Sequence, residues 1–190
     1  MVIAGVDYSL TSPAICIHDG EEWSYDNCTF YYLVNNEKFL NREDEQYVPS
    51  IYPAYREDVE RFHLLSEWSV GNILGHTTDY VALEGYAFGA VGRVFQIAEN
   101  GGLLKHKLWS EEIPVEVYPP TMIKKFATDK GNATKEMMVE AFEKEASVDI
   151  REKCGVVNKQ WNPISDIVDA YYIAKFGFTQ IKAEENDSDI

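Results

Sequence analysis

Cysteine is scarce in this sequence. The three cysteines, Cys16, Cys28 and Cys154, are odd in number and far apart, whereas small secreted scaffolds carry closely spaced cysteines that pair in disulfides. The four histidines are also scattered, and no CxxC or HExxH pattern gives Cys or His the spacing of metal ligands. These absences argue against a disulfide framework and a zinc site, and they favour buried, reduced thiols.

Long apolar runs are absent as well. No stretch approaches the roughly 18 apolar residues that a membrane span needs, and the N-terminus lacks a basic segment followed by an apolar run. We therefore expect a cytoplasmic protein that has no membrane partner. Its 190 residues, 45% of them hydrophobic and 26% charged, are enough for one domain with its own core. We place this domain at residues 1–182 and expect the acidic segment 183–190 to be a frayed tail.

Basic residues are the other scarce class. The chain has 17 Lys and Arg against 32 Asp and Glu, which gives a formal net charge of -15 and at first argues against a nucleic-acid partner. The imbalance is uneven along the chain, however. Residues 1–81 hold 14 acidic and 4 basic residues, whereas residues 82–141 hold 8 acidic and 7 basic ones. The middle of the chain is therefore close to neutral and can face a polyanion.

Apolar periodicity predicts an α/β fold. Strands are expected over residues 2–6, 14–18, 23–34, 80–84 and 115–118. Helices are expected over residues 55–74, 94–108, 119–126, 134–146 and 162–176, the second of them interrupted at Gly101 and Gly102. The first three strands should be antiparallel and the last two parallel, in a five-stranded mixed sheet flanked by helices. The polar segment 35–53, with Pro49 and Pro53, is predicted to be a surface loop or insertion.

Four carboxylates follow a common pattern. Asp7 and Glu84 each close a short apolar strand, and Asp166 and Asp169 are spaced i and i+3 on a helix whose face is otherwise apolar. A single Asp after a strand is most often a turn residue, and one early in a helix is most often a cap. Neighbouring parallel strands are only about 5 Å apart. Four carboxylates gathered there would repel one another unless cations neutralised them.

This donor set predicts a metal site with oxygen ligands. Carboxylate oxygens suit Mg²⁺ or Mn²⁺. Two such ions, about 3.5–4 Å apart, can activate a water molecule and stabilise the leaving oxygen of a phosphodiester. Phosphodiester hydrolysis is therefore the chemistry that the carboxylate pattern favours.

Five stretches carry a family resemblance. They are GVDYSLT at residues 5–11, ALEGYAF at 82–88, PTMIKKF at 120–126, GNATK at 131–135 and DIVDAYYIA at 166–174. As a set they resemble the RuvC-like Holliday junction resolvases, nucleases with the RNase H-like fold, and they are most similar to the phage-type branch. The resemblance covers most of the chain and keeps the spacing of the family's lysine pair. Segment 35–53 is longer and more acidic than we expect for cellular members.

The resemblance implies a homodimer that binds a four-way DNA junction and nicks two opposing strands symmetrically. It implies two Mg²⁺ ions in each active site, for which Mn²⁺ can substitute. The implied catalytic residues are the metal-binding carboxylates Asp7, Glu84, Asp166 and Asp169, and the lysines Lys124 and Lys135 near the scissile phosphate. Tyr86 and Phe88 lie where family members present an aromatic side chain to the opened junction, and core packing is the alternative role for this pair.

Basic residues of the middle segment are candidates for DNA contacts. Arg93 lies near a predicted helix start, where phosphate groups are favoured. The candidates are Arg93, Lys105, Lys107, Lys124, Lys125, Lys130 and Lys135. A solvated basic face is the alternative interpretation. If these residues bind DNA, binding should be salt-sensitive and should favour branched DNA over plain duplex.

Three other functions stay open. Residues 5–11 also resemble the first phosphate loop of actin-like ATPases and sugar kinases, although a second Asp-x-Gly loop and a Gly-rich adenosine site are not evident. A non-catalytic RNase H-like DNA-binding module is the second alternative, but it has no need of four converging carboxylates. The third is a less discriminating nuclease that acts on flaps, forks or RNA–DNA hybrids. The sequence does not indicate a motor partner, and the helix from Val94 is a candidate dimer interface.

Overall fold

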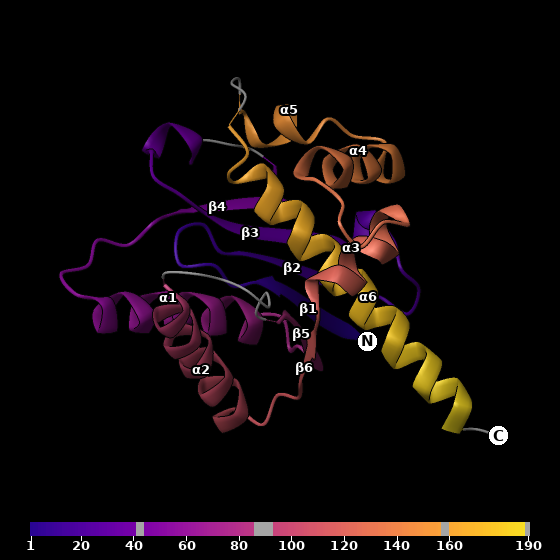
Figure 1. Ribbon diagram of the computed structural model, residues 1–190, viewed down its shortest axis with the longest axis horizontal. Coiled ribbons are helices and arrows are strands. Elements are labelled where there is room, and N and C mark those ends of the chain that lie inside the picture. The colour runs from indigo at the N-terminus through magenta and orange to yellow at the C-terminus, as the bar shows by residue number, and fades with distance from the viewer. Residues whose placement is uncertain (41–43, 86–92, 157–159, 189–190) are drawn as a thin grey trace.

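A six-stranded mixed sheet runs through the centre of the computed structural model, which describes residues 1–40, 44–85, 93–156 and 160–188 (Figure 1). The strands are β1 (Val2–Asp7), β2 (Ala14–Asp19), β3 (Cys28–Val34), β4 (Tyr47–Ile51), β5 (Tyr80–Glu84) and β6 (Val115–Tyr118). Their order across the sheet is β4-β3-β2-β1-β5-β6. β2 is antiparallel to β1 and β3, whereas the β1–β5, β5–β6 and β3–β4 pairs are parallel. The predicted α/β class and mixed sheet are confirmed.

The sixth strand, β4, corrects the prediction of a five-stranded sheet and of a loop over residues 35–53. Tyr47 at the start of β4 is buried and stacks on Phe30 of β3, with 4.9 Å between the ring centroids. Its hydroxyl oxygen lies 3.1 Å from that of Tyr25. Pro49 is compatible with β4 because this strand is at the sheet edge, where one side needs no backbone donor. The acidic composition of residues 35–53 favoured a loop, although the buried side chain of Tyr47 packs a short strand against the sheet.

In the described residues, six α-helices flank the sheet. They are α1 (Asp58–Leu74), α2 (Val94–Ser110), α3 (Pro120–Thr128), α4 (Lys135–Ala146), α5 (Ile150–Cys154) and α6 (Ile164–Ser188). Two short 3-10 helices, η1 (Tyr25–Asn27) and η2 (Glu37–Phe39), lie before and after β3. Thr134 caps α4 by accepting a hydrogen bond from the Met137 backbone nitrogen. The predicted helices are therefore present, and α5 is an addition.

Two helices are longer than predicted. α2 is continuous through Gly101 and Gly102, because a helical glycine costs only about 1 kcal/mol and the burial of Leu104 and Leu108 offsets it. α6 extends to Ser188, beyond the predicted helix end at residue 176. Ile181 is buried in this added part, so the helix keeps an apolar contact beyond residue 176, whereas residues 183–187 are exposed.

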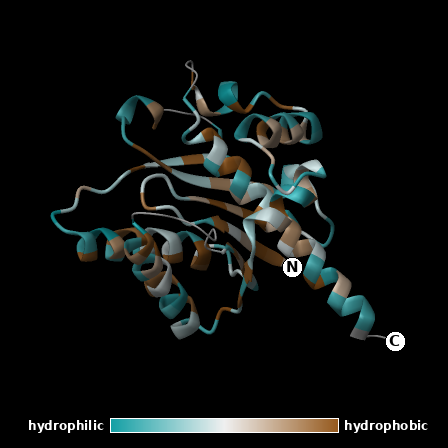
Figure 2. Cartoon of the chain, in the orientation of Figure 1, coloured by the Kyte–Doolittle hydropathy of each residue, from teal (hydrophilic) through white to brown (hydrophobic). Residues whose placement is uncertain are grey.

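The helices cover both faces of the sheet. α6 crosses one face together with α3, α4 and α5, and α1 and α2 cover the other (Figure 1). Side chains alternate along β1, so that Ile3 packs in the core under α6, while Ala4 and Val6 pack in the core under α1 and α2. In Figure 2 the hydrophobic residues gather along the strands, and hydrophilic residues dominate the C-terminal part of α6.

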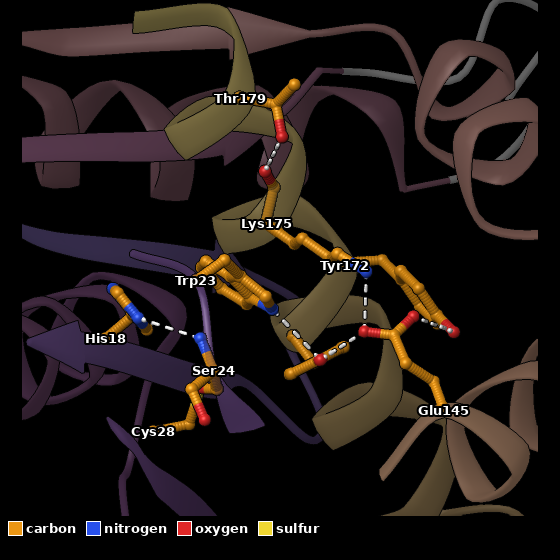
Figure 3. A network of polar contacts seen from close by, with 9 residues as sticks. His18, Trp23, Ser24, Cys28, Glu145, Tyr172, Lys175 and Thr179 are labelled. Atoms are coloured by element: carbon orange, nitrogen blue, oxygen red, sulfur yellow. Dashed lines mark hydrogen bonds and ion pairs between the residues drawn. The ribbon is translucent and has the colours of Figure 1, made fainter. Parts of the chain in front are cut away.

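A polar network fastens α6 to its neighbours (Figure 3). Trp23, between β2 and β3, donates a hydrogen bond of 3.0 Å to the Tyr171 hydroxyl of α6. The Tyr171 hydroxyl in turn donates to the Glu145 carboxylate of α4 at 2.5 Å, and Lys175 of α6 forms an ion pair with the same carboxylate at 2.5 Å. The β2–β3 connection, α4 and α6 are thus tied together on the face that carries the carboxylates described below.

None of the helices in the described ranges has the length and apolar character that crossing a bilayer requires. Cys16, Cys28 and Cys154 are buried thiols, which confirms the interpretation of their spacing.

Candidate active site

Asp7 and Glu84 end neighbouring parallel strands. The β1–β5 register pairs Val6 with Leu83, and Asp7 and Glu84 are the next residues on the two strands. Alternation along β1 places Asp7 on the same side as Ile3, which is the face that α6 covers. The two carboxylates therefore lie side by side at the carboxyl ends of the strands, beneath the start of α6.

Asp166 and Asp169 come from the first turns of α6. Asp166 is 7% exposed, and Ser12 in the β1–β2 loop donates a hydrogen bond of 2.7 Å from its Oγ to Asp166 Oδ2. The other oxygen, Oδ1, lies 3.5 Å from Ser165 Oγ. Lys135 at the start of α4 donates to the same Ser165 hydroxyl at 3.1 Å. Two serines thus orient the Asp166 carboxylate, and one of them links it to Lys135.

The electrostatics show that the four carboxylates form one group. Burial raises the pKa of Asp7 well above its ordinary value, and the charges of Asp166, Asp169 and Glu84 raise it further. Burial, followed by the charges of Glu84 and Asp166, raises the pKa of Asp169 to about 7. Burial also raises the pKa of Asp166 to about 6, against the opposing effect of the Ser12 hydrogen bond. These carboxylates share one partly dehydrated space and repel one another there.

Two lysines oppose this repulsion. Lys124 of α3 lowers the pKa of Glu84 and Asp169, although burial keeps the pKa of Glu84 raised. Burial raises the pKa of Asp7, Asp166 and Asp169, and the charge of Lys135 offsets part of this rise. The structure therefore brings together all six residues that the sequence analysis proposed as catalytic, from five elements that are distant in the chain.

A cavity of about 380 Å³ opens beside Asp7 and Glu84. Its other walls include the β1–β2 loop and one side of α2, where Arg93 at the N-cap and Lys105 further along the helix line the cavity. Two of the predicted DNA-binding residues thus lie next to the carboxylates. A DNA strand in this cavity would have its phosphate groups near the positive charges of Arg93 and Lys105 and near the carboxylates of Asp7 and Glu84.

The remaining predicted DNA contacts are less closely tied to the carboxylates. Lys125 and Lys130 are exposed on and just after α3. Lys107 forms an ion pair with Glu67 of α1, so its charge joins two helices on the far face of the sheet. Tyr86 and Phe88 lie outside the described residues.

Comparison with known proteins decides the fold. The chain has the RuvC fold. It is similar to RuvC of Thermus thermophilus with a TM-score of 0.62, 14% identity and coverage of 96% of this chain and 97% of that one. It is similar to the fowlpox virus resolvase, solved with a substrate Holliday junction, with a TM-score of 0.55, 16% identity and coverage of 95% and 99%. It is also similar to the yeast mitochondrial Holliday junction resolvase Ydc2, with a TM-score of 0.60, 10% identity and coverage of 97% of this chain and 81% of that one. Protein-family models and curated sequences give no match.

The donor chemistry of this RuvC fold fits divalent metal ions. The four side chains offer only carboxylate oxygens, which Mg²⁺ and Mn²⁺ prefer. Burial, and after it the charges of the neighbouring carboxylates, raises the pKa of Asp7 and Asp169, so a bound cation would stabilise their ionised forms. Within the described ranges, no three His, Cys, Asp or Glu side chains already stand in a metal-binding geometry. Asp7, Glu84, Asp166 and Asp169 would supply the ligands, and binding would have to draw them closer.

Sequence reasoning missed the residues that support the site. Ser12 and Ser165 orient Asp166, and the buried Arg61 of α1 donates through its guanidinium to the Leu10 carbonyl of the β1–β2 loop. Ser165 is adjacent in sequence to Asp166, and Ser12 follows the first motif, so proximity alone was an available signal. The role of Arg61 depends on how α1 packs under the loop, and nothing in the local sequence indicates it.

Proposed function

We propose that this protein is a structure-specific endodeoxyribonuclease that nicks four-way and other branched DNA by metal-dependent phosphodiester hydrolysis. The observation that carries the proposal is the convergence of Asp7, Glu84, Asp166 and Asp169 at the carboxyl ends of β1 and β5, where burial, followed by the charges of the neighbouring carboxylates, raises the pKa of Asp7 and Asp169. A binding module has no use for this arrangement, because uncompensated buried carboxylates repel DNA and cost stability.

The chain's own residues have separable tasks in this reaction. When bound, two Mg²⁺ ions would activate the attacking water and stabilise the leaving oxygen of the phosphodiester. Ser12 holds one oxygen of Asp166 at 2.7 Å and so restricts the orientation of that ligand. Lys124 and Lys135, which already offset the carboxylate charges, supply positive charge for the oxygens of the scissile phosphate.

The preference for branched DNA follows from the distribution of charge. Arg93 and Lys105 line the cavity beside the carboxylates, whereas residues 1–81 hold 14 acidic and 4 basic residues. Binding therefore needs several phosphates to reach the few basic residues at once, which a junction offers and a straight duplex does not. Two of the proteins with a similar fold, from Thermus thermophilus and fowlpox virus, were solved with Holliday junction DNA.

The proposal includes a homodimer. One chain carries one group of four carboxylates, so symmetric nicks in two opposing strands require two copies of the chain. The measured molecular mass in solution should therefore be about twice that of the single chain, and the two copies should each contribute one nick.

The decisive experiment is the cleavage of a labelled four-way junction in Mg²⁺, beside matched duplex, flap, fork and RNA–DNA hybrid substrates. The expected result is a pair of symmetric nicks across the junction and little cleavage of duplex. Equal cleavage of all substrates would contradict junction specificity. ATP turnover without cleavage of any DNA would contradict the nuclease proposal altogether.

A further inference from the structure

A second pocket lies at the same sheet edge as the carboxylates. It has a volume of about 430 Å³ and is lined by residues that include Thr11, Ser12, Asn35, Lys38, Phe39 and Asn162. β3 runs parallel to β1, because β2 is antiparallel to both. The residues that follow β3 therefore reach the edge where Asp7 and Glu84 end their strands. Outside the β1–β2 loop, the residues of this pocket have no role in the catalytic and DNA-binding assignments made from the sequence.

The pocket is directly connected to the carboxylates. Ser12 lines it and donates the hydrogen bond of 2.7 Å to Asp166. Asn162 lines it from the segment just before α6, which carries Asp166. Thr11 lines both this pocket and the cavity at Arg93. The two hollows thus share the β1–β2 loop, and a chain bound in the first can continue past the carboxylates into the second.

The composition of the pocket suits a nucleotide. None of its described lining residues is acidic, although the chain has 32 Asp and Glu. Asn35 and Asn162 carry amides, which both donate and accept hydrogen bonds and so match the edges of nucleobases. Phe39 offers an aromatic ring on which a base can stack. The Lys38 ammonium lies 4.7 Å from the centroid of that ring, where it can also reach a phosphate group.

Size and exposure agree with this ligand. About 430 Å³ lies within the range of roughly 300–1,000 Å³ that is typical of small-molecule sites. Asn35, Asn162 and Lys38 are exposed, so their polar groups are accessible to a ligand. Phe39 is half-buried against the core, which holds its ring in place.

We propose that this pocket receives one nucleotide of the cleaved DNA strand, next to the scissile phosphodiester. The base stacks on Phe39 and meets the amides of Asn35 and Asn162, and Lys38 contacts the adjoining phosphate. This inference rests on the proposed nuclease function and deepens it. It also assigns a function to residues 35–39, since residues of this segment would contact the DNA nucleotide next to the cleavage position.

The test couples a pocket variant to a missing base. Junctions carrying one abasic position are prepared for each nucleotide flanking the cut, and their binding is measured by fluorescence anisotropy without divalent metal. Loss of a stacked base should weaken wild-type binding at one position by about 5–150-fold. In Phe39→Ala the same abasic position should cause little further loss, because the stacking partner is already gone. Asn35→Ala, which removes no core contact, provides the same comparison if Phe39→Ala is unstable.

Lys38→Ala gives an independent reading. It should lower the slope of log K against log salt by about one, as the loss of one phosphate contact does. Lys144→Ala is the matched control, because Lys144 is exposed on α4 away from the pocket, and its slope should stay at the wild-type value.

The outcomes separate this inference from the nuclease proposal. Suppose that wild-type protein nicks the intact junction, but that each abasic position lowers junction affinity equally in wild type, Phe39→Ala and Asn35→Ala. The pocket assignment is then overturned and the nuclease proposal stands. If the coupling appears at one position but no junction is nicked in Mg²⁺, the pocket stands and the nuclease proposal fails.

Discussion

Gly5 of β1 lies against the backbone of Ala174 of α6. A β-carbon at residue 5 would stand 2.6 Å from Ala174 Cα and closer still to Ala174 N and Ala170 O. Gly177 makes a similar approach from the helix, since a β-carbon there would lie 2.7 Å from Ala82 Cβ of β5. α6 therefore crosses β1 and β5 with almost no side chain between them, which brings Asp166 and Asp169 down to the level of Asp7 and Glu84.

The close crossing predicts that Gly5→Ala displaces α6. The atoms that the new methyl group would meet belong to the backbone and cannot rotate away, so the cost should be at least the roughly 1–3 kcal/mol of an overpacked core. Thermal melting should show a lower Tm, and junction cleavage should fall further than junction binding. Gly71→Ala in α1 is the control, because no atom lies within 4 Å of its added β-carbon. A Gly5→Ala protein with wild-type Tm and cleavage would show that α6 is not held by this contact.

The strand-end carboxylates could be predicted from sequence, because each apolar run of β1 and β5 stops at a single acidic residue. Asp166 and Asp169 could be predicted as a pair from their helical spacing. Their distance from Asp7 could not, since it depends on Gly5 and Gly177 meeting across the layers of the fold. The motif residues thus indicated which side chains belong to the site, and packing decided how near they lie.

Strand β4 and the hydrogen bond from Ser12 to Asp166 could not be predicted from local sequence patterns either, because both depend on contacts between distant elements. β4 depends on the contact of Tyr47 with Phe30, and composition alone favoured a loop for its acidic surroundings. The hydrogen bond from Ser12 to Asp166 joins residues 154 positions apart. Neither contact leaves a periodic signal in the sequence, because each depends on one side chain meeting another from a distant element.

Removal of single carboxylates should separate cleavage from binding. Glu84→Gln and Asp166→Asn keep the shape of the side chain but remove a charged metal ligand, so Mg²⁺-dependent nicking should fall by at least about 100-fold while junction binding stays within a few fold. Mg²⁺ should raise the Tm of wild-type protein through binding to the folded state, and it should raise the Tm of the variants less. Wild-type cleavage by either variant would contradict the site assignment.

Stability of the metal-free protein should fall as pH rises through the neutral range. The folded-state pKa is about 6 for Asp166 and about 7 for Asp169, against 3.8 for an ordinary Asp. Between about pH 4 and pH 7 the folded state binds more protons than the unfolded state, so the free energy of unfolding decreases with increasing pH. The Tm in a chelator should drop by several degrees from pH 5 to pH 8, because 1 kcal/mol shifts the Tm of such a domain by roughly 2–4 °C.

Asparagine at both positions should reduce this pH dependence, since the amides take up no proton, and Asp7 and Glu84, whose pKa values burial also raises, should account for the slope that is left. Asp187→Asn, at an exposed position near the end of α6, should leave the wild-type slope intact. A slope unchanged by the double substitution would show that these two carboxyl groups are not the source of the effect.

The lysines should matter more for cleavage than for stability. Lys124 and Lys135 offset the charges of the carboxylates, but both are on the rim of the site and neither is buried. Lys124→Ala and Lys135→Ala should therefore reduce the rate of junction cleavage by about 10-fold or more, with a change in Tm of only a few degrees. Lys144→Ala serves again as a control. A large loss of Tm with intact cleavage would assign these lysines a structural role instead.

Arg61 should be the residue of α1 whose loss most affects the β1–β2 loop. Its side chain is buried and donates from Nε to the Leu10 carbonyl at 3.1 Å and to the Tyr52 hydroxyl at 2.9 Å, while Tyr52 donates to the same carbonyl at 2.5 Å. Arg61→Met keeps much of the apolar volume but removes these donors, and an undersatisfied buried carbonyl costs roughly 1–3 kcal/mol.

The matched substitution is Arg56→Met, just before α1, where an exposed arginine pairs with Glu60 at 3.1 Å. Exposed pairs contribute about 0–1 kcal/mol, so chemical denaturation should show a small change for Arg56→Met and a clear loss for Arg61→Met. Because Leu10 lies in the loop that carries Ser12 and lines both hollows beside the carboxylates, Arg61→Met should also raise the dissociation constant for the junction at temperatures where the variant stays folded. If the two arginine variants have the same stability and the same junction affinity, the loop does not depend on α1 for its position.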